Sequence, residues 1–123
     1  MRFVTAALTI AAACASAAVA TAAPRLTDVQ YIAANRCIGL ESTKSLASPD
    51  VDALRRLVKS QDGGRDTYIY DKADQARDDG ARDASRSGAE NNLRLVAERD
   101  GVCRSLASIT TASSGGGSHN MVQ

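Results

Sequence analysis

The chain has 123 residues, of which 44% are hydrophobic and only 3% aromatic, and its formal net charge at pH 7 is +1. A nearly neutral chain without Trp has neither the excess positive charge nor the stacking surfaces that nucleic-acid binding requires. The composition therefore argues against a nucleic-acid partner, and the length fits one small domain.

Residues 1–22 are predicted to be a cleavable signal peptide. Arg2 is followed by apolar or small residues as far as Val19, and the run ends in Ala20-Thr21-Ala22, which fits the small-residue cleavage pattern. The alternative is a transmembrane anchor, but the run is short and rich in Ala. We expect cleavage after Ala22, a periplasmic or secreted protein, and no membrane contact implied after cleavage.

Cys14 raises a second alternative, because Ala11-Ala12-Ala13-Cys14 weakly resembles a lipoprotein-processing site. The Leu usually found three residues before the Cys is absent, and processing there would leave a very short signal. We therefore expect Cys14 to be discarded with the signal peptide. Cleavage would also remove Arg2, so the remaining chain would have equal numbers of acidic and basic residues.

Cys37 and Cys103 then remain, and export would carry them to an oxidising compartment. A disulfide between them is predicted, and closing that long loop would contribute roughly 4 kcal/mol in the chain-entropy model. Metal ligation is disfavoured because there is no CxxC motif and no nearby His. An intermolecular bridge is the other alternative. Leu, Ile and Val make up less than a fifth of the chain beyond residue 22, so a covalent link would support a thin core.

Helical periodicity predicts an all-α fold, a small bundle of three to four helices in which the disulfide joins the first and last. The first helix is expected at Thr27–Glu41, with Thr27 or Asp28 as cap, and its end is expected to fray at Gly39. Asn35 is expected on the wet face. The predicted buried stripe comprises Val29, Ile32, Ala33, Arg36 or Cys37, and Leu40.

The second helix has clearer boundaries. Ser48 is predicted to cap it, Pro49 to be its first residue, and Gly63-Gly64 to stop it. Its stripe comprises Val51, Leu54, Leu57 and Val58. Arg55, Arg56 and Lys59 are interpreted as a solvated helix end, where the helix dipole favours cations.

A third helix is predicted from Asp66 or Thr67, but the stretch from Asp71 to Asn92 has no large apolar side chain. Small residues recur there at spacings of three and four: Ala73, Ala76, Gly80, Ala84 and Gly88. They are a candidate partner face that would let another helix approach closely. The competing interpretation is a solvated helix with few tertiary contacts and poorly protected amides, interrupted near Gly80 or Gly88.

The acidic residues of this stretch suggest a calcium loop, but the spacing does not support one. An EF-hand loop with its invariant glycine at Gly80 would need an oxygen ligand at Arg77, which is a cation. We therefore predict no metal and no cofactor.

The closing helix is expected at Ala89–Ile109, either separate or as one long bent rod with the third helix. Its predicted stripe comprises Leu95, Val102, Leu106 and Ile109, flanked by Leu93, Val96 and Cys103. The helical domain would thus cover residues 23–111, and residues 112–123 would form a flexible Ser/Gly-rich tail. The only His, His119, lies in that tail.

The sequence lacks the side chains that common catalytic mechanisms use, which disfavours an enzyme. The predicted domain has no His, and both of its Cys are expected to be oxidised. Two hypotheses remain: a non-enzymatic binding or interaction protein of the bacterial cell envelope with an unidentified protein partner, or a periplasmic stress or chaperone-like protein with low-specificity clients.

Overall fold

The structure, a computed structural model, describes residues 25–86 and 88–114, and every regular element within these ranges is helical. The elements are α1 (Asp28–Glu41), α2 (Val51–Ser60), α3 (Thr67–Ser85), α4 (Ala89–Glu98), the π-helical turn η1 (Arg99–Cys103) and α5 (Arg104–Ser114). The all-α prediction is confirmed, as is the disulfide between the first and last helices. The predicted signal peptide and residues 115–123 of the predicted tail lie outside the described residues, whereas residues 112–114 of that tail belong to α5.

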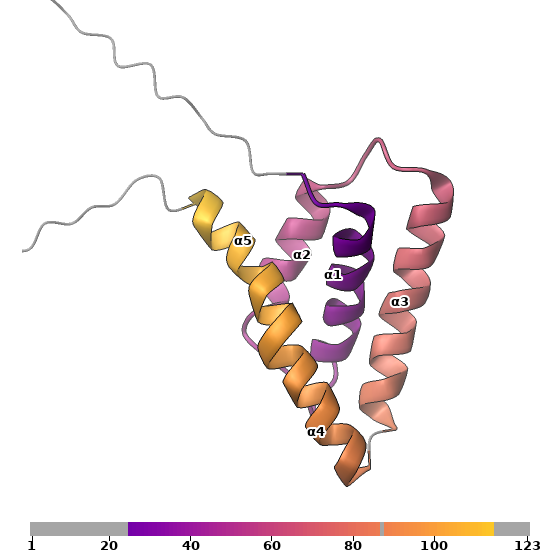
Figure 1. Ribbon diagram of the computed structural model, residues 1–123, viewed down its shortest axis with the longest axis vertical. Helices are drawn as coiled ribbons and strands as arrows, with labels where there is room; N and C mark the ends of the chain where they lie inside the picture. The colour runs from indigo at the N-terminus through magenta and orange to yellow at the C-terminus, as the bar shows by residue number, and fades with distance from the viewer. Residues whose placement is uncertain (1–24, 87, 115–123) are drawn as a thin grey trace, which may run out of the picture.

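α1 lies at the centre of the bundle, between α2 and α3 (Figure 1). α4, η1 and α5 follow one another without a break, and we call them the closing rod. The closing rod crosses the other helices obliquely, from the lower end of α3 to the upper end of α2 (Figure 1). α3 ends at Ser85 and α4 begins at Ala89 in a different direction (Figure 1), so the third helix and the closing helix are two elements rather than one bent rod.

α1 begins with a complete capping box. The backbone N–H of Gln30 donates to Thr27 Oγ1 at 3.2 Å, and the backbone N–H of Thr27 donates to Gln30 Oε1 at 3.0 Å. Two backbone groups that would otherwise lack partners are thereby satisfied, which fixes where the helix starts. The predicted cap at Thr27 agrees with the structure.

The buried surface of α1 is wider than the predicted stripe and rotated from it. Val29 is 77% exposed, so its placement in the core was wrong. Asn35, expected in water, is buried. The fully or largely buried residues of α1 are Tyr31, Ala34, Asn35, Cys37, Ile38, Gly39, Leu40 and Glu41. With neighbours on several sides, a central helix buries most of its circumference and a single stripe underestimates it.

α1 and α3 approach closely through two glycines. A Cβ atom on Gly39 would overlap the Arg77 carbonyl oxygen, and one on Gly80 would overlap the Arg36 carbonyl oxygen. The expected fraying at Gly39 and interruption at Gly80 were therefore wrong, because these positions bring two backbones together. The expectation that this stretch has few tertiary contacts was also wrong for α3, which packs along α1. The helix ends at Ser85 instead and the next begins at Ala89, close to the alternative break predicted near Gly88.

α2 and α3 are joined by a tight connection at the predicted glycines. Gly63 and Gly64 adopt φ values of 109° and 69°, which residues with a Cβ rarely adopt. Before α2, the Ser48 hydroxyl accepts a hydrogen bond from the Asp50 N–H at 3.2 Å, but the N-cap residue is Asp50 and it makes no side-chain capping bond, so the predicted cap at Ser48 was wrong. Regular helix begins at Val51, slightly later than Pro49.

The π-helical turn η1 changes which residues of the closing rod face the core. In an uninterrupted α-helix, Leu95 and Val102 share a face, as the sequence predicted. A π turn takes up one extra residue, so the buried position moves on to Cys103, while Val102 is 54% exposed. The placement of Val102 in the stripe was therefore wrong, and Leu93, which was predicted to flank the stripe, is exposed as well.

Candidate functional site

The disulfide links α1 to the closing rod in the middle of the bundle. Cys37 and Cys103 have a Cα–Cα distance of 5.5 Å, and both are buried. Leu40, Leu54, Leu95 and Leu106 belong to the same core cluster. Because the sulfur atoms are bonded and covered, neither cysteine can act as a thiolate nucleophile or a metal ligand in this state.

The small residues predicted as a partner face are divided by the structure. Ala73, Gly80 and Ala84 are buried, and at Gly80 the neighbour is α1 of the same chain. Ala76 is half-buried, and Gly88 is exposed with no described atom within 4 Å of its Cβ position. The small-residue face thus serves a helix contact within the chain, and a separate protein could reach its buried members only if α1 moved away.

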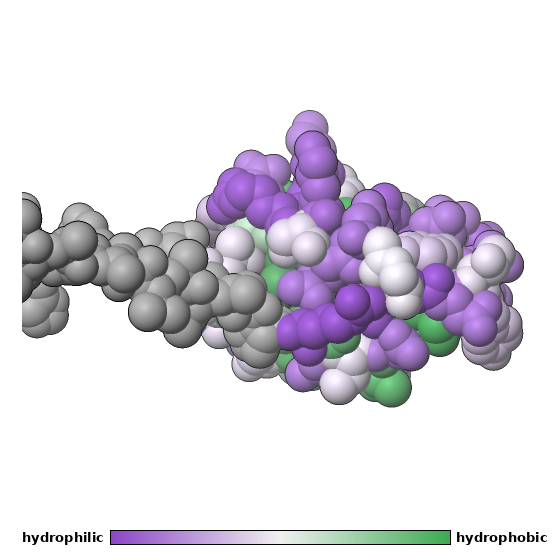
Figure 2. Space-filling view, turned by 90° about the horizontal axis from the view of Figure 1, so that it is seen from above, coloured by the Kyte–Doolittle hydropathy of each residue, from purple (hydrophilic) through white to green (hydrophobic). Residues whose placement is uncertain are grey.

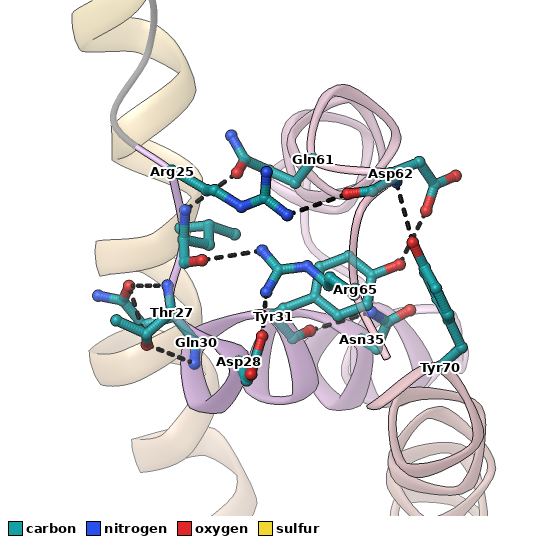
Figure 3. Close-up of polar contacts among 12 residues, drawn as sticks. Arg25, Thr27, Asp28, Gln30, Tyr31, Asn35, Gln61, Asp62, Arg65 and Tyr70 are labelled. Atoms are coloured by element: carbon teal, nitrogen blue, oxygen red, sulfur yellow. Dashed lines mark hydrogen bonds and ion pairs between the residues drawn. The ribbon is translucent and has the colours of Figure 1, made fainter. Parts of the chain in front are cut away.

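A polar cluster around the buried side chains of Tyr31 and Arg65 fastens the α2–α3 connection to the start of α1 (Figure 3). The side chain of Arg65 is 2% exposed, and its guanidinium carbon lies 4.4 Å from the centre of the Tyr31 ring. Arg65 Nη2 donates to the Leu26 carbonyl oxygen at 2.8 Å, while Nη1 pairs with Asp28. A guanidinium group stacked on an aromatic ring and bonded at its edges is well suited to joining segments distant in sequence.

Tyr31 and Tyr70 complete this cluster. The Tyr31 hydroxyl donates to Asp62 Oδ1 at 2.9 Å, and the Tyr70 hydroxyl accepts from the Gly63 N–H at 2.9 Å. Burial, followed by the hydrogen bond to Asp62, raises the pKa of Tyr31 to about 12. The phenol therefore stays neutral at physiological pH, and it acts here as a hydrogen-bond donor that holds the connection in place.

Arg36 links three helices. Its Nε donates to Glu98 Oε1 on α4 at 2.7 Å, and its Nη2 donates to Asp83 Oδ2 on α3 at 2.9 Å. The hydrogen bond to Glu98 is the main reason why the pKa of Arg36 is raised above its ordinary value. Arg36, which the sequence offered as an alternative to Cys37 in the buried stripe, bridges α1, α3 and the closing rod.

Glu41 is the least expected buried residue. It is the last residue of α1, it is 2% exposed, and neither carboxylate oxygen has a hydrogen-bond partner among the described residues. Burial, followed by the nearby charge of Asp50, raises the pKa of Glu41 to about 7. No periodicity signalled it, because a Glu at a helix end is ordinarily interpreted as solvated.

An apolar groove runs between α1 and the closing rod. It has a volume of about 560 Å³ and is open to solvent. Its lining residues are Val29, Gln30, Ala33, Gly101, Val102, Ser105 and Leu106. By contrast, the end of the molecule seen in Figure 2 is covered mostly by hydrophilic side chains, with hydrophobic surface in small separate areas. The groove has a more apolar lining than the pocket at Gly88 and Arg94 or the one at Arg25 and Gln61, which makes it the main candidate for a binding surface in the described part of the chain.

The groove arises from the two departures of the structure from the predicted stripes. Val29 faces outward because α1 buries its other sides, and Val102 faces outward because η1 shifts the register of the closing rod. These two valines were assigned to the core from the sequence. Both occupy apolar positions at helical spacing, so no signal in the sequence distinguished them from core residues.

Within residues 25–86 and 88–114, no group of three or more His, Cys, Asp or Glu side chains is arranged to hold a metal ion. The acidic residues Asp71, Asp74 and Asp78 are exposed on α3. Over the same residues, no helix combines the length and the apolar character that crossing a bilayer would need. His119 lies outside the described residues.

Comparison of the chain with protein-family models, with curated protein sequences and with solved structures gives no match. Any functional inference must therefore come from the geometry of the chain itself.

Proposed function

We propose that this protein is exported and acts as a non-enzymatic binding protein of the bacterial cell envelope, in the periplasm or outside the cell. The disulfide between Cys37 and Cys103 supports an oxidising compartment, because such bonds are rare in the cytosol. The apolar run and the Ala20-Thr21-Ala22 pattern support export as well.

The observation that carries the binding function is the groove between α1 and the closing rod. Val29 and Val102 are large apolar side chains at 77% and 54% exposure, and they lie in one groove rather than scattered. Apolar surface gathered in a groove is typical of an interaction site. Gln30 and Ser105 are the polar residues of its lining and can accept or donate hydrogen bonds to a partner's backbone or side chains.

The proposed partner is an amphipathic helix of another envelope protein, which would place its apolar side chains between α1 and the closing rod. A trough with two helices as walls fits this mode of recognition. A small-molecule ligand is less suitable, because such ligands are usually enclosed over most of their surface, whereas this groove is open.

Site-specific photo-crosslinking tests the proposal. A photoreactive amino acid is placed at Val29 or Val102 in living cells, and Leu93 provides the matched control because it is 76% exposed but outside the groove lining. We expect positions 29 and 102 to give one discrete adduct that position 93 does not give. Equal labelling at all three positions, or none, would contradict a binding function for the groove.

The same experiment separates the alternative function. A chaperone-like protein with low-specificity clients would give many adducts of different mass from positions 29 and 102. An adduct at twice the mass of the chain would identify a second copy as the occupant. If one partner is identified, Val29→Ser with Val102→Ser should weaken its binding at least tenfold in purified form, while Leu93→Ser should leave it unchanged.

A further inference from the structure

The end of α1 holds a carboxyl group whose burial its neighbours offset only in part. Glu41 is 2% exposed, and neither Oε1 nor Oε2 has a hydrogen-bond partner in the described residues. A buried polar group without hydrogen bonds costs free energy, and an ionised carboxylate costs far more than a neutral carboxylic acid. Its position adds to the cost, because the C-terminal end of a helix carries partial negative charge.

The neighbouring elements supply charges that are already paired. Asp50, at the start of α2, repels a second carboxylate, whereas Arg99 of η1 and Arg104 of α5 attract one. Arg99 Nε lies 2.9 Å from Asp100 Oδ1, and Arg104 Nε lies 3.8 Å from Asp50 Oδ2, so both cations have acidic partners of their own. The Ser48 hydroxyl also favours the charged form, but it does not outweigh burial.

α3 is the other element packed on this end of α1, and it contacts it through small residues. Gly80 meets the backbone of Arg36 and Leu40, and the hydroxyl of Ser45, in the loop after α1, donates to the Ala84 carbonyl oxygen at 3.4 Å. The groups that act most strongly on Glu41 lie in the loop before α2, at the start of α2 and on the closing rod, and none of them lies on α3. The protonation state of Glu41 therefore depends on its burial and on the charges near α2 and the closing rod.

We propose that Glu41 is a pH-sensitive packing contact: with its carboxyl group neutral, the end of α1 stays packed against α2 and η1, and with the proton lost, this end of the bundle loosens. The contact is a property of the fold and does not depend on the binding function proposed above. It makes the protein more stable in mildly acidic than in neutral surroundings.

The direction follows from proton binding. In the folded protein the pKa of Glu41 is about 7, whereas its ordinary value is 4.5. Between these values the folded protein holds a proton that the unfolded chain releases, so stability falls as pH rises through this window and levels off above it. The unfolding equilibrium constant should rise by up to about tenfold for each pH unit within the window.

Two measurements on the purified protein with its disulfide intact test the proposal. NMR titration of the Glu41 carboxyl carbon should give a midpoint near 7. Thermal unfolding between about pH 5 and pH 8 should show the melting temperature falling by roughly 10 °C. Glu41→Gln should remove most of that fall, and Glu90→Gln, which changes an exposed Glu on α4, should keep it.

The outcomes are decisive in either direction. A Glu41 midpoint near its ordinary value, or a Glu41→Gln variant with the same pH profile as the unchanged protein, would overturn the proposal. If Glu41→Gln does not fold, the NMR midpoint decides alone. Asp50→Asn gives a further check, because removal of the neighbouring negative charge should lower the Glu41 midpoint, and an unchanged midpoint would refute the role given to Asp50.

Discussion

α3 and the closing rod are held to α1 in different ways. α3 contacts it along its length through Gly39 and Gly80, where the two backbones approach closely. The closing rod contacts it through the Cys37–Cys103 bond, and an open apolar groove remains beside that contact. In a chain with few large apolar residues, close backbone packing can thus hold α1 on one side and a covalent bond can hold it on the other.

The two contacts differ in what they leave exposed. At the α1–α3 contact, close backbone approach leaves no space for other side chains, so the surface is fully used. At the contact with the closing rod, the bond holds the helices at one point, and the apolar residues beside it remain available to solvent. The covalently held side is therefore the one suited to binding another molecule.

Removal of the disulfide should have the largest effect. Cys37→Ala with Cys103→Ala opens a loop with a sequence separation of 66 residues, so the free energy of unfolding should fall by roughly 4 kcal/mol. Denaturant titration measures this loss. Hydrogen exchange should show protection falling further in η1 and α5 than in α1 and α3. Protection lost first in α3 would contradict the comparison, and so would two free thiols in the unreduced native protein.

Addition of one methyl group at the glycine contact should have the next largest effect. In Gly39→Ala the new Cβ would meet the Arg77 carbonyl oxygen, and backbone cannot move aside as a flexible side chain can. We expect a loss of about 3 kcal/mol, with Gly80→Ala similar. Thermal or urea unfolding checks both, and Gly88→Ala, which meets no described atom within 4 Å, is the matched control.

Features of the molecule that depend on local sequence could be predicted, whereas those that depend on contacts between helices could not. Local sequence propensity predicted the helices and their boundaries at Thr27 and Gly63-Gly64. The expected oxidising compartment predicted the pairing of Cys37 with Cys103. The close approach at Gly39 could not be predicted, because a glycine within a helix indicates lower helix stability unless the packing partner is known. The partner became visible only when α3 was placed against α1.

The groove and the buried carboxyl group escaped prediction for a related reason. Periodicity assumes a uniform α-helix, and η1 breaks that assumption by shifting the buried position from Val102 to Cys103. Periodicity also assumes that charged residues face water, whereas Glu41 ends a helix enclosed on several sides. The residues that carry both proposals are thus those at which tertiary packing overrides the local pattern.

Substitution of Arg36 should reduce the free energy of unfolding by less, and its side chain contacts both α3 and the closing rod. It pairs with Asp83 on α3 and with Glu98 on α4, and it is itself a quarter exposed. Arg36→Met should lower the free energy of unfolding by about 1 kcal/mol, since partly exposed ion pairs contribute little. Double-mutant cycles with Asp83→Asn and Glu98→Gln should give the larger coupling energy for Glu98, which is less exposed and shares two hydrogen bonds with Arg36. Equal couplings would argue against the distinction.

The smallest effect, and the one with the opposite sign, is expected at Gly101. This residue lies in η1, on the open side of the closing rod, and no described atom lies within 4 Å of its Cβ position. Its φ is not positive, so a side chain introduces no backbone strain there. Because Ala restricts the unfolded chain more than Gly does and favours helix, Gly101→Ala should stabilise the protein by about 0.5 kcal/mol.

The same Gly→Ala change should thus destabilise the protein at Gly39 and stabilise it slightly at Gly101, and the difference in sign tests the comparison directly. Urea unfolding of both variants, with thiol titration to establish that the Cys37–Cys103 bond has formed, makes the measurement. A loss of stability above about 1 kcal/mol in Gly101→Ala would show that the π-helical turn itself requires glycine. The register shift that buries Cys103 and exposes Val102 would then depend on Gly101, and this residue would control both the disulfide and the groove.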